Sequence, residues 1–339
     1  MRIEKFREAL SGIPFDGGLI TAESDIEYLT GFDGGGILYL DEKEAVLFVS
    51  GVSLNAALDL LDGKLDCRLY SGKFPESEIR LLSAGKKVFF EAGQIGYTYA
   101  ILFSSLGYKD HRIMESLRVI KEPVEIDMIR TSCRLAAGVL NSVDPEEWRG
   151  RTEAELAGYL ENQSWKNGAS GRAFQPIVAA GKNAAYPHHI PTNNIIQTAA
   201  LKIDYGLKFK GYCSDLTRTY ILTKFIDHFE SERLLEALER AKEASVSLLR
   251  PGVKCSAIHA AAFDVLSEYG LEKYFTHGVG HGIGLQVHEA PRLAPGVDSL
   301  LEESMTLTVE PGLYIRGYGG MRVEDTYLIT AEGSELLTS

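Results

Sequence analysis

Four acidic residues of this sequence stand inside, or directly after, apolar runs with the composition of β-strands. They are Asp204 after AALKI, Asp215 within YCSDLTRTY, Glu310 after LTV and Glu324 after GMRV. Taken singly, such residues cap turns, line edge strands or form an ion pair, as Glu324 could with Arg322. Burying an unpaired carboxylate is costly, so a fold that gathers all four must also supply positive charge.

The segment from Thr276 to Glu289 combines three histidines, His277, His281 and His288, with four glycines. Glycine allows backbone and ligand to approach closely, and imidazole is a common metal ligand or proton carrier. A nucleotide-binding loop is disfavoured because the glycines follow GxGxGxG rather than GxGxxG. A zincin site is excluded because no second histidine completes HExxH after His288-Glu289.

Together with His281, the four carboxylates make an oxygen-rich donor set that can hold two divalent cations. Two-metal sites of this kind place the ions about 3.5–4 Å apart. Oxygen donors suit manganese, cobalt or iron better than thiolate-loving metals. We expect manganese first, with cobalt, iron and zinc as alternatives. Without cations these acids would repel one another.

Composition and charge limit the partners and the compartment of the chain. A net charge of −12 argues against gripping a nucleic acid backbone, which requires clustered Lys and Arg. No run of about 18 apolar residues predicts a membrane span, and no basic-then-apolar start resembles a secretory signal. We expect a cytoplasmic protein, because the widely spaced cysteines form no CxxC pair and are typical of reduced thiols: Cys67, Cys133, Cys213 and Cys255.

The 339 residues suit two domains, and the pattern changes near residue 118. Residues 1–117 alternate short strands with helices, which predicts an α/β domain. Pro123 is expected in the first turn of a helix, and Thr152 to Glu155 predicts a capping box before another. The other expected helices are 52–61, 231–249 and 256–269, and the expected strands are 18–20, 36–40, 45–49, 87–90, 176–180, 199–205, 212–222, 305–309 and 321–329.

Five motifs, in this order, resemble those of the pita-bread metallopeptidases, in the Xaa-Pro branch that contains prolidase and aminopeptidase P. The resemblance implies an α+β pita-bread catalytic domain over residues 118–339. Residues 1–117 are similar, more weakly, to the creatinase-type N-terminal domain, through IEYLTGF at 26–32. The five motifs are DYG at 204–206, SDLTRT at 214–219, GHGIG at 280–284, VEPG at 309–312 and RVED at 322–325.

This resemblance implies a role for each member of the donor set. Asp204 would bind one metal, His281 and Glu310 the other, and Asp215 and Glu324 would bridge the two. Glu310 would also carry the proton that the leaving proline nitrogen requires. All five positions match the family pattern. A homodimer is expected from the resemblance alone.

The resemblance also implies a substrate pocket made of cationic and imidazole side chains. His188 and His288 would hydrogen-bond the scissile carbonyl and its oxyanion, and His277 would line the same pocket. Arg322 is also expected at this pocket. Together with Thr217, it would orient the metal-binding carboxylates. Arg292 is similar to the arginine with which some prolidases grip the C-terminal carboxylate of the substrate, although surface exposure explains it equally well.

Several functions stay open at this point. Prolidase, which cuts Xaa-Pro dipeptides, leads over aminopeptidase P, which releases the residue before proline from longer peptides. Methionine aminopeptidase ordinarily lacks the extra N-terminal domain, and creatinase-like enzymes use this fold without metals. A non-catalytic peptide-binding relative usually loses ligands, and none is missing here. A hydrolase of another small amide is a further alternative. The expected partners are small proline-containing peptides.

Overall fold

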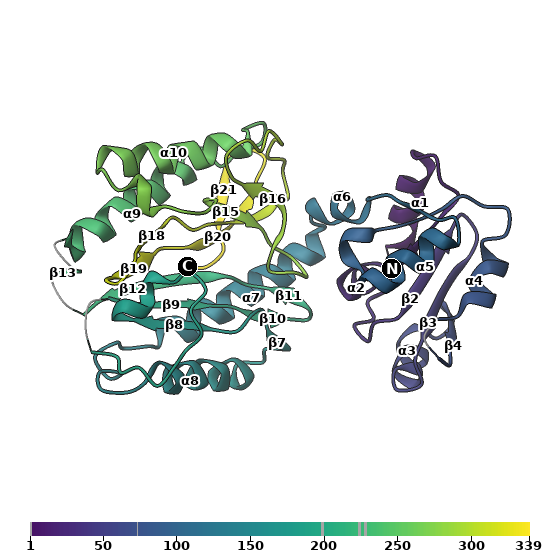
Figure 1. Cartoon of the computed structure of the whole chain (residues 1–339), viewed down its shortest axis with the longest axis horizontal. Coiled ribbons are helices and arrows are strands. Elements are labelled where there is room, and N and C mark those ends of the chain that lie inside the picture. Colours follow the sequence, from purple (N-terminus) through teal and green to yellow (C-terminus); the bar gives the residue numbers. More distant parts are fainter. Residues whose placement is uncertain (1, 73, 198–199, 223–224, 227–228) are drawn as a thin grey trace. The chain divides into compact units, whose positions relative to one another are not determined.

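A computed structural model describes residues 2–72, 74–197, 200–222, 225–226 and 229–339. The chain forms two compact units, Met1–Arg118 and Val119–Ser339 (Figure 1). Within the described ranges, no helix has both the length and the apolar character that crossing a membrane requires.

The first unit is built on one mixed sheet. Its strands are β1 (Gly17–Ile20), β2 (Ile37–Asp41), β3 (Ala45–Val49), β4 (Asp66–Leu69), β5 (Val88–Phe90) and β6 (Lys109–Asp110), and its helices are α1 (Ile3–Ser11), α2 (Glu23–Thr30), α3 (Leu54–Leu61), α4 (Glu76–Leu82), the 3₁₀ turn η1 (Ala92–Gln94), α5 (Tyr97–Ser105) and α6 (Met114–Val119). The order across the sheet is β4-β3-β2-β1-β5-β6. Pairing is antiparallel among β1, β2 and β3, and parallel elsewhere. The apolar runs that predicted β1, β2, β3 and β5 are buried almost throughout, which confirms those strands.

Four long helices frame the second unit. They are α7 (Pro123–Asn141), α8 (Glu153–Lys166), α9 (Ser231–Val246) and α10 (Cys255–Glu268); the 3₁₀ turn η2 (Gly181–Ala185) lies between α8 and α9, and η3 (Glu272–Tyr274) follows α10. Pro123 is the first residue of α7, as predicted. The predicted capping box opens α8: the Thr152 hydroxyl accepts from the Glu155 amide at 3.2 Å, and the Glu155 carboxylate accepts from the Thr152 amide at 2.7 Å.

The strands of the second unit lie between α8 on one side and α9 and α10 on the other (Figure 1). They are β7 (Gly171–Arg172), β8 (Ile177–Ala180), β9 (Ala200–Tyr205), β10 (Leu207–Phe209), β11 (Tyr212–Cys213), β12 (Leu216–Ile221), β13 (Phe225–Ile226), β14 (Phe229–Glu230), β15 (Gly280–Gly282), β16 (Glu289–Leu293), β17 (Thr306–Val309), β18 (Gly312–Ile315), β19 (Gly319–Arg322), β20 (Asp325–Ile329) and β21 (Ser334–Leu336). The two sheets that matter for function have the orders β12-β9-β8 and β16-β15-β17-β20-β21. Ala199, the first residue of one predicted strand, lies outside the described residues.

Two large hydrophobic cores stabilise the described part of this unit. One is shared by α7, α8, β8, β9 and β12, and includes Leu140, Leu156 and Ile203. The other is shared by α9, α10 and the strands from β17 to β20, and includes Leu238 and Leu307. Of the four acidic residues singled out in the sequence, Asp204 lies on β9, and the other three lie next to strands of these cores.

Two predicted strands are each interrupted at an acidic residue, which corrects the continuous strands expected at 212–222 and 321–329. The first is split into β11 and β12 by Ser214 and Asp215, and the second into β19 and β20 by Val323 and Glu324. At each break the chain changes its pairing partner: β11 pairs with β10 and β12 with β9, while β19 pairs with β18 and β20 with β17. The acidic residue at each break is therefore released from its sheet ladder.

Candidate metal centre

Asp204 lies on the central strand of a three-stranded sheet. On β9 it stands opposite Thr217 of β12 and Ile177 of β8. Its side chain is buried. Because both neighbouring strands fix the register, the direction of this carboxylate is set by the sheet itself.

Asp215 and Glu324 occupy the two strand breaks and are held there by threonines. The Thr326 hydroxyl donates to the backbone carbonyl of Asp215 at 2.7 Å. The Thr217 hydroxyl donates to Glu324 Oε2 at 2.6 Å, and the Glu324 amide donates to the Thr217 carbonyl at 3.2 Å. Both carboxylates are almost fully buried. The threonines thus fix two acids that no regular ladder holds.

His281 is the middle residue of the short strand β15, between Gly280 and Gly282. A Cβ at Gly280 would lie 2.0 Å from the Thr308 carbonyl oxygen, and one at Gly282 would lie 2.0 Å from the Ala290 carbonyl oxygen. These glycines therefore let β16 and β17 approach β15 closely. This differs from the expected close approach of backbone and ligand, because the neighbours here are other strands.

Glu310 directly follows β17 and faces His281. Its amide donates to the Val279 carbonyl at 2.7 Å. His281 Nε2 lies 3.4 Å from Glu310 Oε1 and 3.7 Å from Asp215 Oδ2. Donor atoms of Asp215, His281 and Glu324 all lie within 4.8 Å of one another. Residues separated by more than a hundred positions in the sequence therefore converge on one point.

Burial and mutual repulsion disfavour negative charge on these acids. Burial raises the pKa of Asp215 well above its usual range, and the neighbouring Glu324, Asp204 and Glu310 raise it further. The pKa values of Glu324 and Glu310 are raised by burial for the same reason. Burial lowers the pKa of His281 to about 4, so this imidazole is neutral and able to bind a metal at neutral pH.

The described residues fit the binding of divalent cations. Asp204 Oδ1 and Asp215 Oδ1 are buried and have no hydrogen-bond partner among those residues. Buried polar atoms of this kind are nearly always satisfied, so each one requires an explanation. Cations would satisfy both oxygens and remove the repulsion between the acids. Four carboxylates and one neutral imidazole are donors suited to manganese, cobalt, iron or zinc.

Arg322, the last residue of β19, is the one cationic side chain that contacts this described cluster. Its Nη2 donates to Asp204 Oδ2 and its Nε donates to Thr217 Oγ1 at 3.0 Å. The same Nε lies 3.8 Å from Glu310 Oε2 and from Glu324 Oε2. This geometry fits the expected role of orienting the carboxylates. Direct contact between Arg322 and a substrate stays a prediction.

Tyr314 belongs to this network and was missed in the sequence. On β18, its hydroxyl accepts from Arg322 Nη1 at 2.9 Å and lies 3.1 Å from His277 Nε2. Burial raises the pKa of Tyr314 to about 12, so the hydroxyl keeps its proton at neutral pH. The available signal was its position four residues after Glu310 in EPGLY, but tyrosine is also common in strands and gives no chemical hint alone.

Three of the predicted pocket histidines lie around the carboxylate cluster. The rings of His281 and His288 pack edge to face with centroids 4.3 Å apart. Burial lowers the pKa of His288, and His281 and His188 lower it further. Burial likewise lowers the pKa of His277, with a contribution from His188. His188 is therefore close enough to influence both rings, while its own side chain is exposed.

Arg292 lies beside the cluster on β16. It is exposed between two buried residues and stands directly opposite His281 in the antiparallel pairing of β15 and β16. Side chains at opposite positions project from the same face of a sheet. Arg292 therefore faces the side on which His281 projects, where solvent can reach it.

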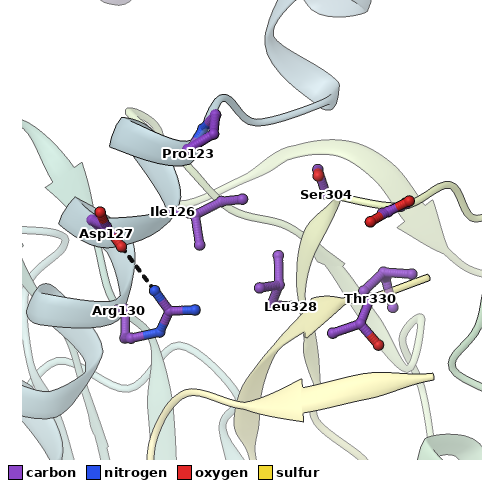
Figure 2. Close-up of a pocket in the computed structure, with 9 residues that line it drawn as sticks. Pro123, Ile126, Asp127, Arg130, Ser304, Leu328 and Thr330 are labelled. Carbon is purple, nitrogen blue, oxygen red and sulfur yellow. Dashed lines mark hydrogen bonds and ion pairs between the residues drawn. The ribbon is translucent and has the colours of Figure 1, made fainter. Parts of the chain in front are cut away.

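Figure 2 shows a surface pocket of the second unit that contains none of the predicted site residues. At this pocket Arg130 pairs with Asp127 at 2.9 Å. The pocket lies between the start of α7 and the end of β20, and its lining residues are Pro123, Ile126, Asp127, Arg130, Glu303, Ser304, Leu328, Ile329 and Thr330. Its aliphatic and surface-charged lining offers no metal-binding set.

Comparison with known proteins assigns the chain to a family. Residues 127–331 match the model of Metallopeptidase family M24. The chain belongs to this family. Residues 2–106 of this M24 protein match the Creatinase/Prolidase N-terminal domain. These matches confirm the predicted fold class, a creatinase-type α/β domain followed by an α+β pita-bread domain.

Relatives of this M24 protein include enzymes named for both predicted activities. The Xaa-Pro dipeptidase of Pyrococcus furiosus is 30% identical over 99% of this chain and 97% of its own length. A solved Xaa-Pro dipeptidase from Bacillus anthracis superimposes with a TM-score of 0.89 at 31% identity, covering 100% of this chain and 97% of that one. A solved X-Pro aminopeptidase from Thermotoga maritima gives 0.84 at 27% identity, covering 100% and 98%.

Proposed function

We propose that this M24 protein is a metal-dependent Xaa-Pro dipeptidase, which hydrolyses the bond before proline in dipeptides and short peptides. The observation that carries this proposal is the buried convergence of Asp215, His281 and Glu324, with Glu310 beside them, in a chain similar over its full length to a dipeptidase of this name. Small proline-containing peptides are the proposed substrates.

Five side chains would hold the metals: Asp204, Asp215, His281, Glu310 and Glu324. Two divalent cations bound there, manganese first, would polarise the scissile carbonyl and activate a water molecule. Two observations support this proposal. Two buried carboxylate oxygens of the described cluster have no hydrogen-bond partner, and the neighbouring acids disfavour negative charge on Asp215. Only Arg322 brings positive charge to the described cluster, so bound cations would complete its charge balance.

The chain supplies proton transfer and substrate contacts. Glu310 would accept a proton from the attacking water and deliver it to the proline nitrogen, which cannot leave unprotonated. A buried carboxyl whose pKa is raised by burial is suited to carrying a proton at neutral pH. His188 and His288 would hydrogen-bond the carbonyl oxygen as it becomes an oxyanion. His277, held by Tyr314, would line the pocket.

Aminopeptidase P activity is the second candidate, supported by the likeness to the Thermotoga maritima enzyme. The two candidates differ in whether the substrate ends at proline. Arg292, exposed opposite His281, would bind the C-terminal carboxylate of a dipeptide. We also propose a homodimer, a cytoplasmic location consistent with widely spaced cysteines, and domains that meet between residues 117 and 118.

The test compares Ala-Pro with Ala-Pro-Ala on protein loaded with manganese. We expect faster cleavage of the dipeptide, and Arg292→Ala should raise KM for Ala-Pro about tenfold or more while leaving Ala-Pro-Ala little changed. Lys273→Ala, which removes an exposed charge on η3, is the matched control. Cleavage of the tripeptide alone would reassign the chain to aminopeptidase P activity. Turnover of neither peptide would contradict the proposed function.

A further inference from the structure

The segment that carries His188 has little regular structure of its own. Residues 186–194, which follow η2, contain neither helix nor strand. Among the described residues the His188 imidazole forms no hydrogen bond, and it is exposed. Its position must therefore be set by whatever holds the backbone on either side of it.

One buried carboxylate holds this segment along its length. Glu153, the first residue of α8, has no solvent exposure. Its two oxygens accept hydrogen bonds from five residues that flank His188 in the sequence. These are the amide of Ala180 at 2.8 Å, the side chain of Asn183 at 3.0 and 3.2 Å, the ring of His189 at 2.8 Å, the amide and hydroxyl of Thr192 at 3.1 and 2.9 Å, and the side chain of Asn194 at 3.0 Å.

The backbone at the start of α8 contacts the same segment. The Glu153 amide donates to the Asn194 carbonyl at 3.0 Å, and the Ala154 amide donates to the Thr192 carbonyl at 2.9 Å. The first turn of a helix leaves its amides without helical partners. Here the segment supplies those partners, so α8 and the segment depend on each other.

A buried lysine holds the segment from a second direction. Lys202 on β9 has no solvent exposure, and its Nζ donates to the carbonyls of Ala184 at 3.3 Å, Tyr186 at 2.9 Å and Pro187 at 3.4 Å. The last of these carbonyls belongs to the residue directly before His188. The backbone is thus anchored on both sides of the histidine.

We propose that Glu153 is a positioning residue for His188, with Lys202 holding the other end of the same segment. The inference rests on the proposed function, in which His188 contacts the substrate carbonyl. Glu153 would not touch the substrate or the metals. Its ionised carboxylate fixes the loop backbone, so that an exposed imidazole is presented to the pocket in one place.

Replacing the carboxylate by an amide tests this role with almost no change in shape. An ionised carboxylate only accepts hydrogen bonds, whereas the amide nitrogen of glutamine only donates. In Glu153→Gln, whichever oxygen is replaced, at least three of the hydrogen bonds accepted by Glu153 are lost: three if Oε1 is replaced and four if Oε2 is replaced. We expect kcat/KM on Ala-Pro to fall about 10- to 100-fold. The fall should be in kcat with KM little changed, because the His188 hydrogen bond strengthens in the transition state.

A double-mutant cycle separates positioning from a general structural role. His188→Ala should lower kcat/KM about 100-fold or more. In that background Glu153→Gln should change kcat/KM by less than about threefold, since the group it positions is gone. Effects that multiply instead would overturn the inference, as would a loss of bound metal in Glu153→Gln measured by mass spectrometry.

The matched control is Glu125→Gln. Glu125 is another buried glutamate in the first turn of a helix, α7, where its carboxylate accepts hydrogen bonds from the Tyr212 hydroxyl at 3.0 Å and from the Glu122 amide at 3.0 Å. Glu125→Gln should lower kcat/KM only slightly, and the factor should be the same in wild type and in His188→Ala. If Glu153→Gln fails to fold, His189→Ala, which removes one hydrogen bond to Glu153, should show the same non-additivity at about threefold to tenfold.

A measurement that needs no turnover keeps this inference separate from the proposed function. Hydrogen exchange of amides in residues 186–194 should become about tenfold faster or more in Glu153→Gln, with α9 and α10 unchanged. Unchanged exchange in that segment would overturn the inference even in an active enzyme. Conversely, a wild-type protein that cleaves neither Ala-Pro nor Ala-Pro-Ala would refute the proposed function, while hydrogen exchange would still test the anchoring.

Discussion

At the residue scale, the dominant feature of the candidate metal centre is the electrostatic cost of burying several acids together. Asp204, Asp215, Glu310 and Glu324 are gathered in a buried site where Arg322 is the cationic side chain of the described cluster. Burial and mutual repulsion raise the pKa of Asp215, Glu310 and Glu324. The folded protein without metal should therefore be destabilised by its own site.

This reasoning predicts that Asp215→Asn changes stability in opposite directions with and without metal. Without metal, removing an acid that burial and its acidic neighbours disfavour should raise the melting temperature of the second unit by about 2–4 °C, the shift expected from about 1 kcal/mol in a unit of this size. With manganese, the substitution should lower the melting temperature, because a ligand is lost and binding to the folded state stabilises it less. Differential scanning calorimetry with EDTA and with manganese measures both.

Asp298→Asn is the control for that prediction. Asp298 is exposed and pairs with Lys254 on the surface at 3.2 Å. Its replacement should shift neither melting temperature by more than the small amount typical of surface positions. A lower melting temperature for Asp215→Asn in EDTA as well would show that the metal-free acids do not repel as described.

At the element scale, sequence patterns predicted the four long helices of the second unit, α3 of the first unit and the longer strands of both units. The helices α1, α2, α4, α5 and α6 of the first unit were not predicted. Apolar runs, Pro123 and the Thr152 capping box are local signals, and each was confirmed. The breaks at Asp215 and Glu324 were not predicted, because β-branched and apolar residues continue on both sides of them. A change of pairing partner depends on the other strands, which no local window contains.

The glycines around His281 lead to a prediction for strand packing. In Gly282→Ala the new Cβ would meet the Ala290 carbonyl oxygen at 2.0 Å, on a backbone that cannot move alone. We expect the second unit to lose about 3 kcal/mol of unfolding free energy or more, beyond ordinary overpacking, and to bind metal more weakly. Denaturant unfolding and metal titration measure the two effects.

Gly333→Ala provides the contrast, because nothing lies within 4 Å of the Cβ it would add. That variant should be close to wild type in both measurements. If Gly282→Ala were equally well tolerated, β15 and β16 would not approach each other as closely at Gly282 as described.

At the scale of the whole molecule, the two units should respond differently to solution conditions. The stability of the second unit should depend on bound metal, and that of the first unit should depend on pH through Asp41. Burial alone would raise the pKa of Asp41. Hydrogen bonds from the Glu44 amide at 2.7 Å, Lys86 Nζ at 2.5 Å and the Lys43 amide at 2.8 Å outweigh burial and lower this pKa to about 2. A depressed pKa in the folded state stabilises the fold when the carboxyl is ionised.

We therefore predict a contribution from Asp41 of roughly 2 kcal/mol at neutral pH. It should be complete above the unfolded pKa of about 4 and disappear as the pH falls through about 2. Comparing hydrogen exchange on β2 and β3 between wild type and Asp41→Asn at each pH measures it. If the difference in exchange protection between wild type and Asp41→Asn were the same at pH 7 and below pH 2, the stabilisation would not come from ionised Asp41.

How much of the site was predictable also depends on scale. Asp204, Asp215, His281, Glu310 and Glu324 were singled out as candidates in the sequence because acids and imidazole are conspicuous among apolar and glycine-rich residues. Tyr314, Glu153 and Lys202 were not, because their roles depend on partners far away in the sequence. A helix-starting glutamate such as Glu153 is ordinarily a surface residue, and only the fold reveals that it is buried.

We propose above all that two cations bind among five converging side chains. Anomalous diffraction from crystals of the protein grown with manganese tests it most directly. Two anomalous peaks should appear, each bounded by oxygens or nitrogen of Asp204, Asp215, His281, Glu310 and Glu324, and Asp215→Asn should weaken both peaks. Crystals with these side chains apart, or with no anomalous peak among them at saturating manganese, would contradict the account.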